Sequence, residues 1–107
     1  MNDIGRISVL FERLVDLMLV RGFSNIKDLP GCAEIRIDER WQVAVNGHSE
    51  ATKCSHGPEI PAYAAYVQCN GWPAGIITPY GGVVAAGKLA NEATLLEAID
   101  AAIARGA

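Results

Sequence analysis

The densest run of turn and cap signals in this chain extends from Cys69 to Ile99 and begins Cys69-Asn-Gly-Trp-Pro-Ala-Gly-Ile-Ile-Thr-Pro-Tyr-Gly-Gly-Val-Val-Ala-Ala-Gly-Lys-Leu-Ala-Asn-Glu92. Asn70-Gly71 is a strong hairpin-turn signal, and the Gly-rich segment 79–82 marks a second turn. The apolar residues after each turn predict short strands over 72–78 and 83–86. Asn91 is a good helix N-cap, so a helix should follow and end at Gly106.

The same stretch contains a near-match to a nucleotide-binding loop. Gly82 to Lys88 fits G-x-x-x-x-G-K, but Leu89 stands where the motif needs a Ser or Thr hydroxyl for magnesium. The four intervening residues also have the pattern of a strand. We therefore interpret these glycines as turn and cap residues, and nucleotide hydrolysis is not expected.

Upstream, the sequence predicts one helix and three further strands. Apolar residues recur at steps of three and four from Ile4 to Val20, which is typical of an amphipathic helix, and Gly22 can end it. Glu34–Asp38 and Trp41–Val45 alternate polar and apolar residues, and Ala62–Gln68 has strand composition. The side chains expected to face the first helix are Ile35, Ile37, Trp41, Val43 and Val45.

These elements predict a single α+β domain over residues 1–107. Its order is an N-terminal helix, an antiparallel meander of about five short strands and a C-terminal helix, with both helices on one face of the sheet. The other face should then stay solvated or bind a ligand. The long polar loop 46–61 has no predictable conformation, although Asn46-Gly47 is a turn signal.

Composition narrows the classes of function. The net charge of −3 and the acidic pI near 5.2 argue against nucleic acid as a partner. We find no run long enough to cross a membrane and no secretory signal pattern at the N-terminus. Three cysteines without an export signal favour free thiols, so we expect a cytoplasmic protein, in whatever cell hosts it.

Zinc-type ligands occur in and near the long loop: His48, Cys54, His56 and Cys69. None of the common paired spacings of zinc sites is present, so we expect no cofactor and keep zinc as the less favoured hypothesis. A second alternative is a small thiol enzyme, in which His56 would activate Cys54.

We favour a non-enzymatic binding protein, because the chain has several Tyr and Trp residues and no catalytic constellation. The residues expected to contact a partner are Trp72, Tyr80, Glu50 and Glu59, of which the two acidic residues would suit a basic partner. A third alternative is a self-associating structural protein, with the first helix as the seam of a homodimer.

The C-terminal third also resembles a group of known proteins. Asn70-Gly-Trp-Pro-Ala-Gly-Ile-Ile, Pro79-Tyr-Gly-Gly, Ala85-Ala-Gly87 and Ala90-Asn-Glu92 before a Leu/Ala-rich helix are similar to small accessory proteins of phages and prophages. The resemblance implies a viral protein that binds a host or phage protein, including inhibitors of bacterial immunity such as anti-CRISPR proteins. It transfers no site residue.

Overall fold

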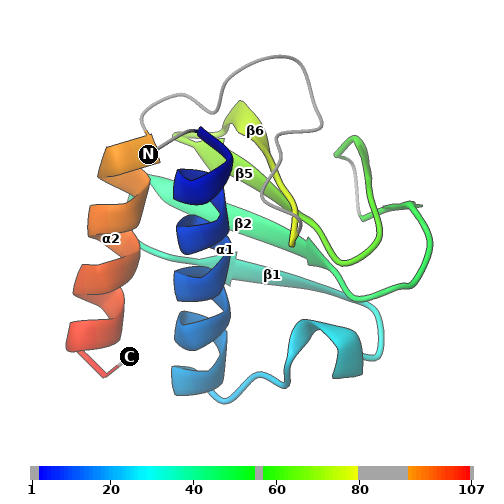
Figure 1. The fold of residues 1–107 in the computed structure, drawn as a ribbon, viewed down its shortest axis with the longest axis horizontal. Coiled ribbons are helices and arrows are strands. Elements are labelled where there is room, and N and C mark those ends of the chain that lie inside the picture. The colour runs from blue at the N-terminus through cyan, green and yellow to red at the C-terminus, as the bar shows by residue number, and fades with distance from the viewer. Residues whose placement is uncertain (1–2, 55–56, 80–91, 107) are drawn as a thin grey trace.

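The computed structural model describes residues 3–54, 57–79 and 92–106, with side chains described from residue 9 and, in the second helix, from residue 94. Two α-helices, a short 3-10 helix and six strands make up this part of the chain (Figure 1). They are α1 (Asp3–Val20), η1 (Ile26–Asp28), β1 (Cys32–Arg36), β2 (Trp41–Asn46), β3 (Thr52–Lys53), β4 (Glu59–Ile60), β5 (Ala65–Cys69), β6 (Trp72–Ile77) and α2 (Glu92–Ala104). The expected α+β class is confirmed.

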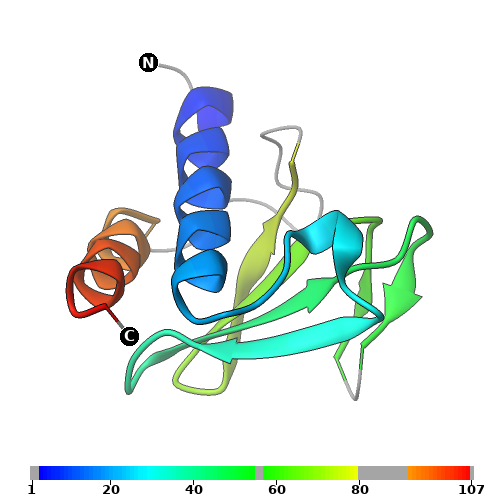
Figure 2. The same ribbon diagram turned by 90° about the horizontal axis from the view of Figure 1, so that it is seen from below.

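The main sheet is an antiparallel meander with the strand order β1-β2-β5-β6, and β3 pairs with β4 in a separate small sheet. Figures 1 and 2 show both helices together on one side of the main sheet. Figure 2 also shows that the β1–β2 and β5–β6 turns lie at one end of the strands, whereas β3 and β4 lie at the other. The expected strand over 83–86 lies outside the described residues.

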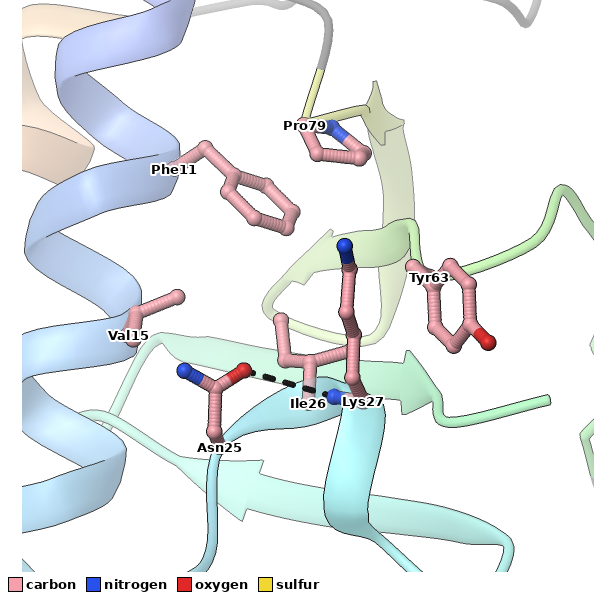
Figure 3. Close-up of a pocket in the computed structure, with 7 residues that line it drawn as sticks. All are labelled: Phe11, Val15, Asn25, Ile26, Lys27, Tyr63 and Pro79. Atoms are coloured by element: carbon pink, nitrogen blue, oxygen red, sulfur yellow. Dashed lines mark hydrogen bonds between the residues drawn. The ribbon is translucent and has the colours of Figure 1, made fainter. Parts of the chain in front are cut away.

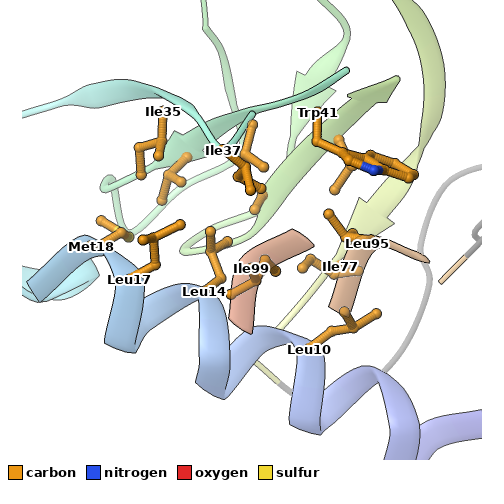
Figure 4. Close-up of a cluster of buried hydrophobic side chains, with 14 of the residues drawn as sticks. Leu10, Leu14, Leu17, Met18, Ile35, Ile37, Trp41, Ile77, Leu95 and Ile99 are labelled. Atoms are coloured by element: carbon orange, nitrogen blue, oxygen red, sulfur yellow. The ribbon is translucent and has the colours of Figure 1, made fainter. Parts of the chain in front are cut away.

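The main core fills the space between the helices and the sheet (Figure 4). Its strand side chains are at most 2% exposed and include the set expected from alternation: Ile35, Ile37, Trp41, Val43 and Val45. The helices pack against these strand side chains with Leu10, Leu14, Leu17 and Met18 of α1 and with Leu95 and Ile99 of α2. Alternation therefore predicted the buried face of the first two strands correctly, because burial along a half-buried strand follows a period of two residues.

The second face of the sheet is not simply solvated, which corrects the expectation from sequence. The alternate residues Ala44, Tyr66 and Ile76 form one row across β2, β5 and β6. Cys54 and Ile60 pack with this row in a second, smaller core. The segment with β3 and β4 thus covers one half of this face, while the row Arg36, Gln42, Gln68 and Pro73 at the other half remains partly or fully exposed.

The segment 46–61 is folded and held at several points. Asn46 is fully buried, and its amide nitrogen donates to the carbonyl oxygens of Glu50 (3.0 Å), Ile60 (2.9 Å) and Pro61 (3.1 Å). Its side-chain oxygen accepts from the backbone N–H of His48 at 2.9 Å. Asn46 is the last residue of β2 and the centre of a hydrogen-bond network, and its bond to the His48 N–H closes the turn expected at Asn46-Gly47 as an Asx turn.

A disulfide between Cys32 and Cys54 adds a covalent link from this segment to β1. The expectation of free thiols is therefore wrong for these two residues, and it holds for Cys69. The two sulfurs meet only because the segment folds back over the second face of the sheet, which the spacing of the cysteines could not reveal.

The turns and helix ends follow local sequence signals. Asn70 and Gly71 both have positive φ (53° and 81°), as a type I′ hairpin requires. Gly22 (φ 87°) ends α1, with Phe23 N–H donating to the Met18 carbonyl at 2.9 Å, and Gly106 (φ 67°) follows α2.

An ion pair links the two helices at the surface. Arg13 of α1 donates to Asp100 of α2 at 2.8 Å and to Asp16 of its own helix at 2.9 Å. The hydrogen bond to Asp100 raises the pKa of the Arg13 guanidinium, so the group stays charged at any ordinary pH. Because these groups are exposed, we treat the pair as a minor contribution to stability.

Candidate binding surfaces

Trp72 is the most exposed large apolar side chain of the described residues, at 75%. It starts β6 directly after the type I′ turn and pairs with Cys69, which in turn pairs with Trp41 across β2. Residues in one such row point to the same face of a sheet, so Trp41 and Trp72 share the helix side. Trp41 is 1% exposed within the core, whereas Trp72 lies in an exposed run over residues 70–73.

The acidic residues expected at the same contact surface lie elsewhere. Glu50 and Glu59 are both exposed, and their backbones are held near each other because Asn46 binds the carbonyls of Glu50 and Ile60. They belong to the segment at the far end of the strands from Trp72 (Figure 2). The four residue steps from Trp41 to Val45 alone correspond to about 13 Å. The structure therefore does not bring Trp72 together with Glu50 and Glu59, and Tyr80 lies outside the described residues.

The candidate zinc and thiol residues also do not converge. Cys54 is bonded to Cys32 on the second face of the sheet, while Cys69 is half-buried against the main core on the other. His48 is exposed, and His56 lies outside the described residues. No group of three or more His, Cys, Asp or Glu side chains in the part of the chain that the structure describes could hold a metal ion. With its sulfur in the disulfide, Cys54 has no thiolate to act as nucleophile or ligand.

Helix α1 carries the exposed apolar residues that bear on self-association. Leu19 and Val20 are 52% and 45% exposed near its C-terminal end, and Val9 is 37% exposed. Scattered exposed apolar residues are normal on a protein surface, so this set does not by itself define a seam. Among the described residues, no helix combines the length and hydropathy that a membrane span needs.

One concave site that the sequence did not indicate lies between α1, η1, Tyr63 and the end of β6 (Figure 3). Its residues come from four separate segments of the sequence. The only sequence signal for the site was the presence of two polar side chains, Lys27 and Tyr63, and neither belongs to a motif. Comparison of the chain with protein-family models, curated protein sequences and solved structures gives no match. The geometry of the described residues is therefore the basis for the binding sites proposed below.

Proposed function

We propose that this chain is a non-enzymatic binding protein that contacts a partner protein through Trp72 and the adjoining turn. The observation that carries the proposal is the 75% exposure of Trp72 in a chain that buries its other tryptophan almost completely. Trp is enriched among the residues that dominate binding energy at protein interfaces, because it buries a large area and loses few rotamers. A solvent-facing Trp at this position contributes little to the folded monomer.

The local structure supports a preorganised contact. The type I′ turn and the pairing of Trp72 with Cys69 fix the backbone of the side chain, so little backbone entropy is lost on binding. The backbone N–H of Asn70 also donates to the Arg40 carbonyl at 2.8 Å, which ties the turn to the neighbouring β1–β2 connection. Glu50 and Glu59, at the far end of the strands, are assigned to a separate acidic surface.

The kind of partner follows from the resemblance of the C-terminal third to phage and prophage accessory proteins. On that basis we propose a host or phage protein as the partner, with inhibition of a bacterial defence system, as by anti-CRISPR proteins, as the particular activity. The proposed location is the cytoplasm of the host cell. Disulfides are rare in the cytosol, so the state of the Cys32–Cys54 bond in the cell tests this location.

Binding is tested with a matched pair of variants. The tagged protein captures partners from a bacterial lysate, each identified partner is purified, and its affinity is measured for wild type, Trp72→Ala and Leu19→Ala. We expect Trp72→Ala to weaken binding by about 10-fold or more and Leu19→Ala, also a large exposed apolar side chain, to leave it unchanged. If all three proteins bind the partner with equal affinity, and urea unfolding curves show that each is folded, Trp72 does not contact the partner.

The inhibitory activity and the compartment have separate tests. Expression of the chain in bacteria with an active CRISPR system should restore plaque formation by a targeted phage, and Trp72→Ala should not; unchanged immunity contradicts this particular activity. For the compartment, cells are quenched in acid and their thiols alkylated. Modification of Cys32, Cys54 and Cys69 indicates a reduced cytoplasmic protein, whereas modification of Cys69 alone contradicts a cytoplasmic location.

A further inference from the structure

The pocket beside α1 has apolar walls and a volume of about 160 Å³ (Figure 3). Phe11 and Val15 of α1 form one wall, residues 25–27 form the floor, and Tyr63 and Pro79 form the opposite side. An engineered cavity of similar size binds benzene, so this space suits one six-membered ring or a branched aliphatic group. It is too small for a nucleotide.

A positive charge stands in this apolar pocket. The Lys27 ammonium lies 5.9 Å from the centre of the Tyr63 ring, and Figure 3 shows it between Phe11, Pro79 and Tyr63. Within the part of the chain that the structure describes, Lys27 makes no ion pair with a carboxylate. A cation beside apolar walls and without an acidic partner favours a ligand that supplies an anion.

A second polar group comes from the cap of η1. The side-chain oxygen of Asn25 accepts from the backbone N–H of Lys27 at 3.3 Å, which fixes the plane of the amide. The amide nitrogen has no hydrogen-bond partner among the described residues, and it lies on the Val15 side of the pocket (Figure 3). The pocket therefore offers two donors, of which only Lys27 carries charge.

Tyr63 adds an independent indication that this site has a role. It occupies the third position of the turn from Pro61 to Ala64, in which the Ala64 N–H donates to the Pro61 carbonyl at 3.1 Å. Its φ of 57° is uncommon for a bulky residue, and Gly or Asn would adopt it at lower cost. A residue keeps a strained backbone conformation where the surrounding structure imposes it, and such residues are concentrated at ligand-binding and active sites. Here the strained backbone directs the ring beneath Lys27 and into the pocket wall.

We propose that the pocket binds a small monocarboxylate with one aromatic ring or a branched aliphatic body. The apolar group would lie between Phe11, Val15 and Pro79, and the carboxylate would pair with Lys27. A single lysine matches one negative charge, so a phosphate or a dicarboxylate would leave charge unpaired in an apolar site. This inference does not depend on the proposed contact through Trp72, which lies at a different part of the molecule.

The test uses phenylacetate as the probe and amide chemical shifts of the ¹⁵N-labelled full chain as the readout. We expect saturable shifts at residues 25–27 and Tyr63, with a dissociation constant of about 1 mM or tighter for a ligand of about ten heavy atoms. Phenylacetamide and phenethylammonium have the same ring without the negative charge. Each should bind at least about 10-fold more weakly than phenylacetate.

Lysine variants give the matched control. Lys27→Met keeps the apolar stem and should weaken phenylacetate binding about 10-fold or more, while Lys53→Met, an exposed lysine on β3, should leave it unchanged. Absence of saturable shifts up to about 20 mM, shifts centred away from the pocket, or equal binding by Lys27→Met and wild type would each overturn the proposal. Both lysines are exposed, so both variants should fold.

Discussion

Asn46 provides the most direct test of how the segment 46–61 is held. Its amide group has two hydrogens but three carbonyl acceptors within 3.1 Å, so at least one hydrogen is shared. In Asn46→Ala all three carbonyls lose this donor, and the His48 N–H loses its acceptor. The hydrogen bond to the Ile60 carbonyl is buried, so this oxygen would be left without a partner. The Glu50 and Pro61 carbonyls and the His48 N–H are partly buried and can form some hydrogen bonds to water.

A buried polar group without a partner costs about 1–3 kcal/mol, and a partly buried one costs less. Asn46→Ala should therefore lower the free energy of unfolding by about 2–4 kcal/mol, a large share of the about 5–15 kcal/mol of a typical domain. Urea denaturation followed by tryptophan fluorescence measures the loss, because Trp41 lies in the main core. The matched control is Asn25→Ala, an exposed Asn with one side-chain hydrogen bond, for which we expect a loss of at most about 1 kcal/mol.

Asn46→Asp sharpens the test because it keeps the shape and removes the donors. The carboxylate would face three carbonyl oxygens in a buried site, so the folded state should raise the pKa of this Asp above its value in the unfolded chain. Relative to wild type, the stability of the variant should then be highest at low pH, where the acid is protonated in both states, and should fall as the pH rises through the two pKa values. If Asn46→Ala loses no more than Asn25→Ala, or Asn46→Asp shows no loss of stability at neutral pH, Asn46 does not hold the segment.

Two further variants test the same region of the fold. Loss of the Cys32–Cys54 disulfide in the double variant Cys32→Ser/Cys54→Ser should lower the free energy of unfolding by about 3 kcal/mol, the loop-closure entropy for a separation of 22 residues. Wild type in reducing buffer should be as unstable as the variant. An unchanged urea midpoint in both cases would contradict a stabilising disulfide. Gly47→Ala should also be destabilising by more than about 2 kcal/mol, because the added Cβ would lie 2.6 Å from both the Gly31 carbonyl oxygen and the Leu29 Cβ. Gly71→Ala is the control, because a Cβ at this position meets no atom within 4 Å and the substitution adds only the cost of a positive φ. If the Gly47→Ala protein is as stable as the Gly71→Ala protein, the clash of the new Cβ with Gly31 and Leu29 relaxes easily.

Local signals were sufficient for most of the architecture. The helix over 4–20 and the four strands of the main sheet were predicted within a few residues, because their buried faces follow simple periods. Gly22, Gly106 and Asn70-Gly71 ended or turned the chain as expected, since a positive φ depends on the residue itself. Asn46-Gly47 has the same sequence signal, but here the Asn46 side chain closes an Asx turn, and contacts from distant segments bury this side chain at the end of β2.

The candidate sites were less predictable, because each depends on segments that are distant in the sequence. Exposure of Trp72 and burial of Trp41 agreed with expectation, whereas the distance from Trp72 to Glu50 and Glu59 could not be foreseen without the order of the strands. The pocket at Lys27 combines four segments, none of which carries a recognisable motif.

By itself, the sequence determined the class of the fold, the core-facing residues of the first two strands and the position of the β5–β6 hairpin turn, because these follow from residues that are close together in the sequence. The tertiary structure alone decided that Cys32 meets Cys54, that Asn46 holds segment 46–61 through its side chain, and that Lys27 lies at an apolar pocket with no carboxylate partner among the described residues. The physical reason is that hydrophobic periodicity specifies which side of an element is buried, but not which distant segment covers it. That choice depends on the packing of the whole chain over both faces of the sheet.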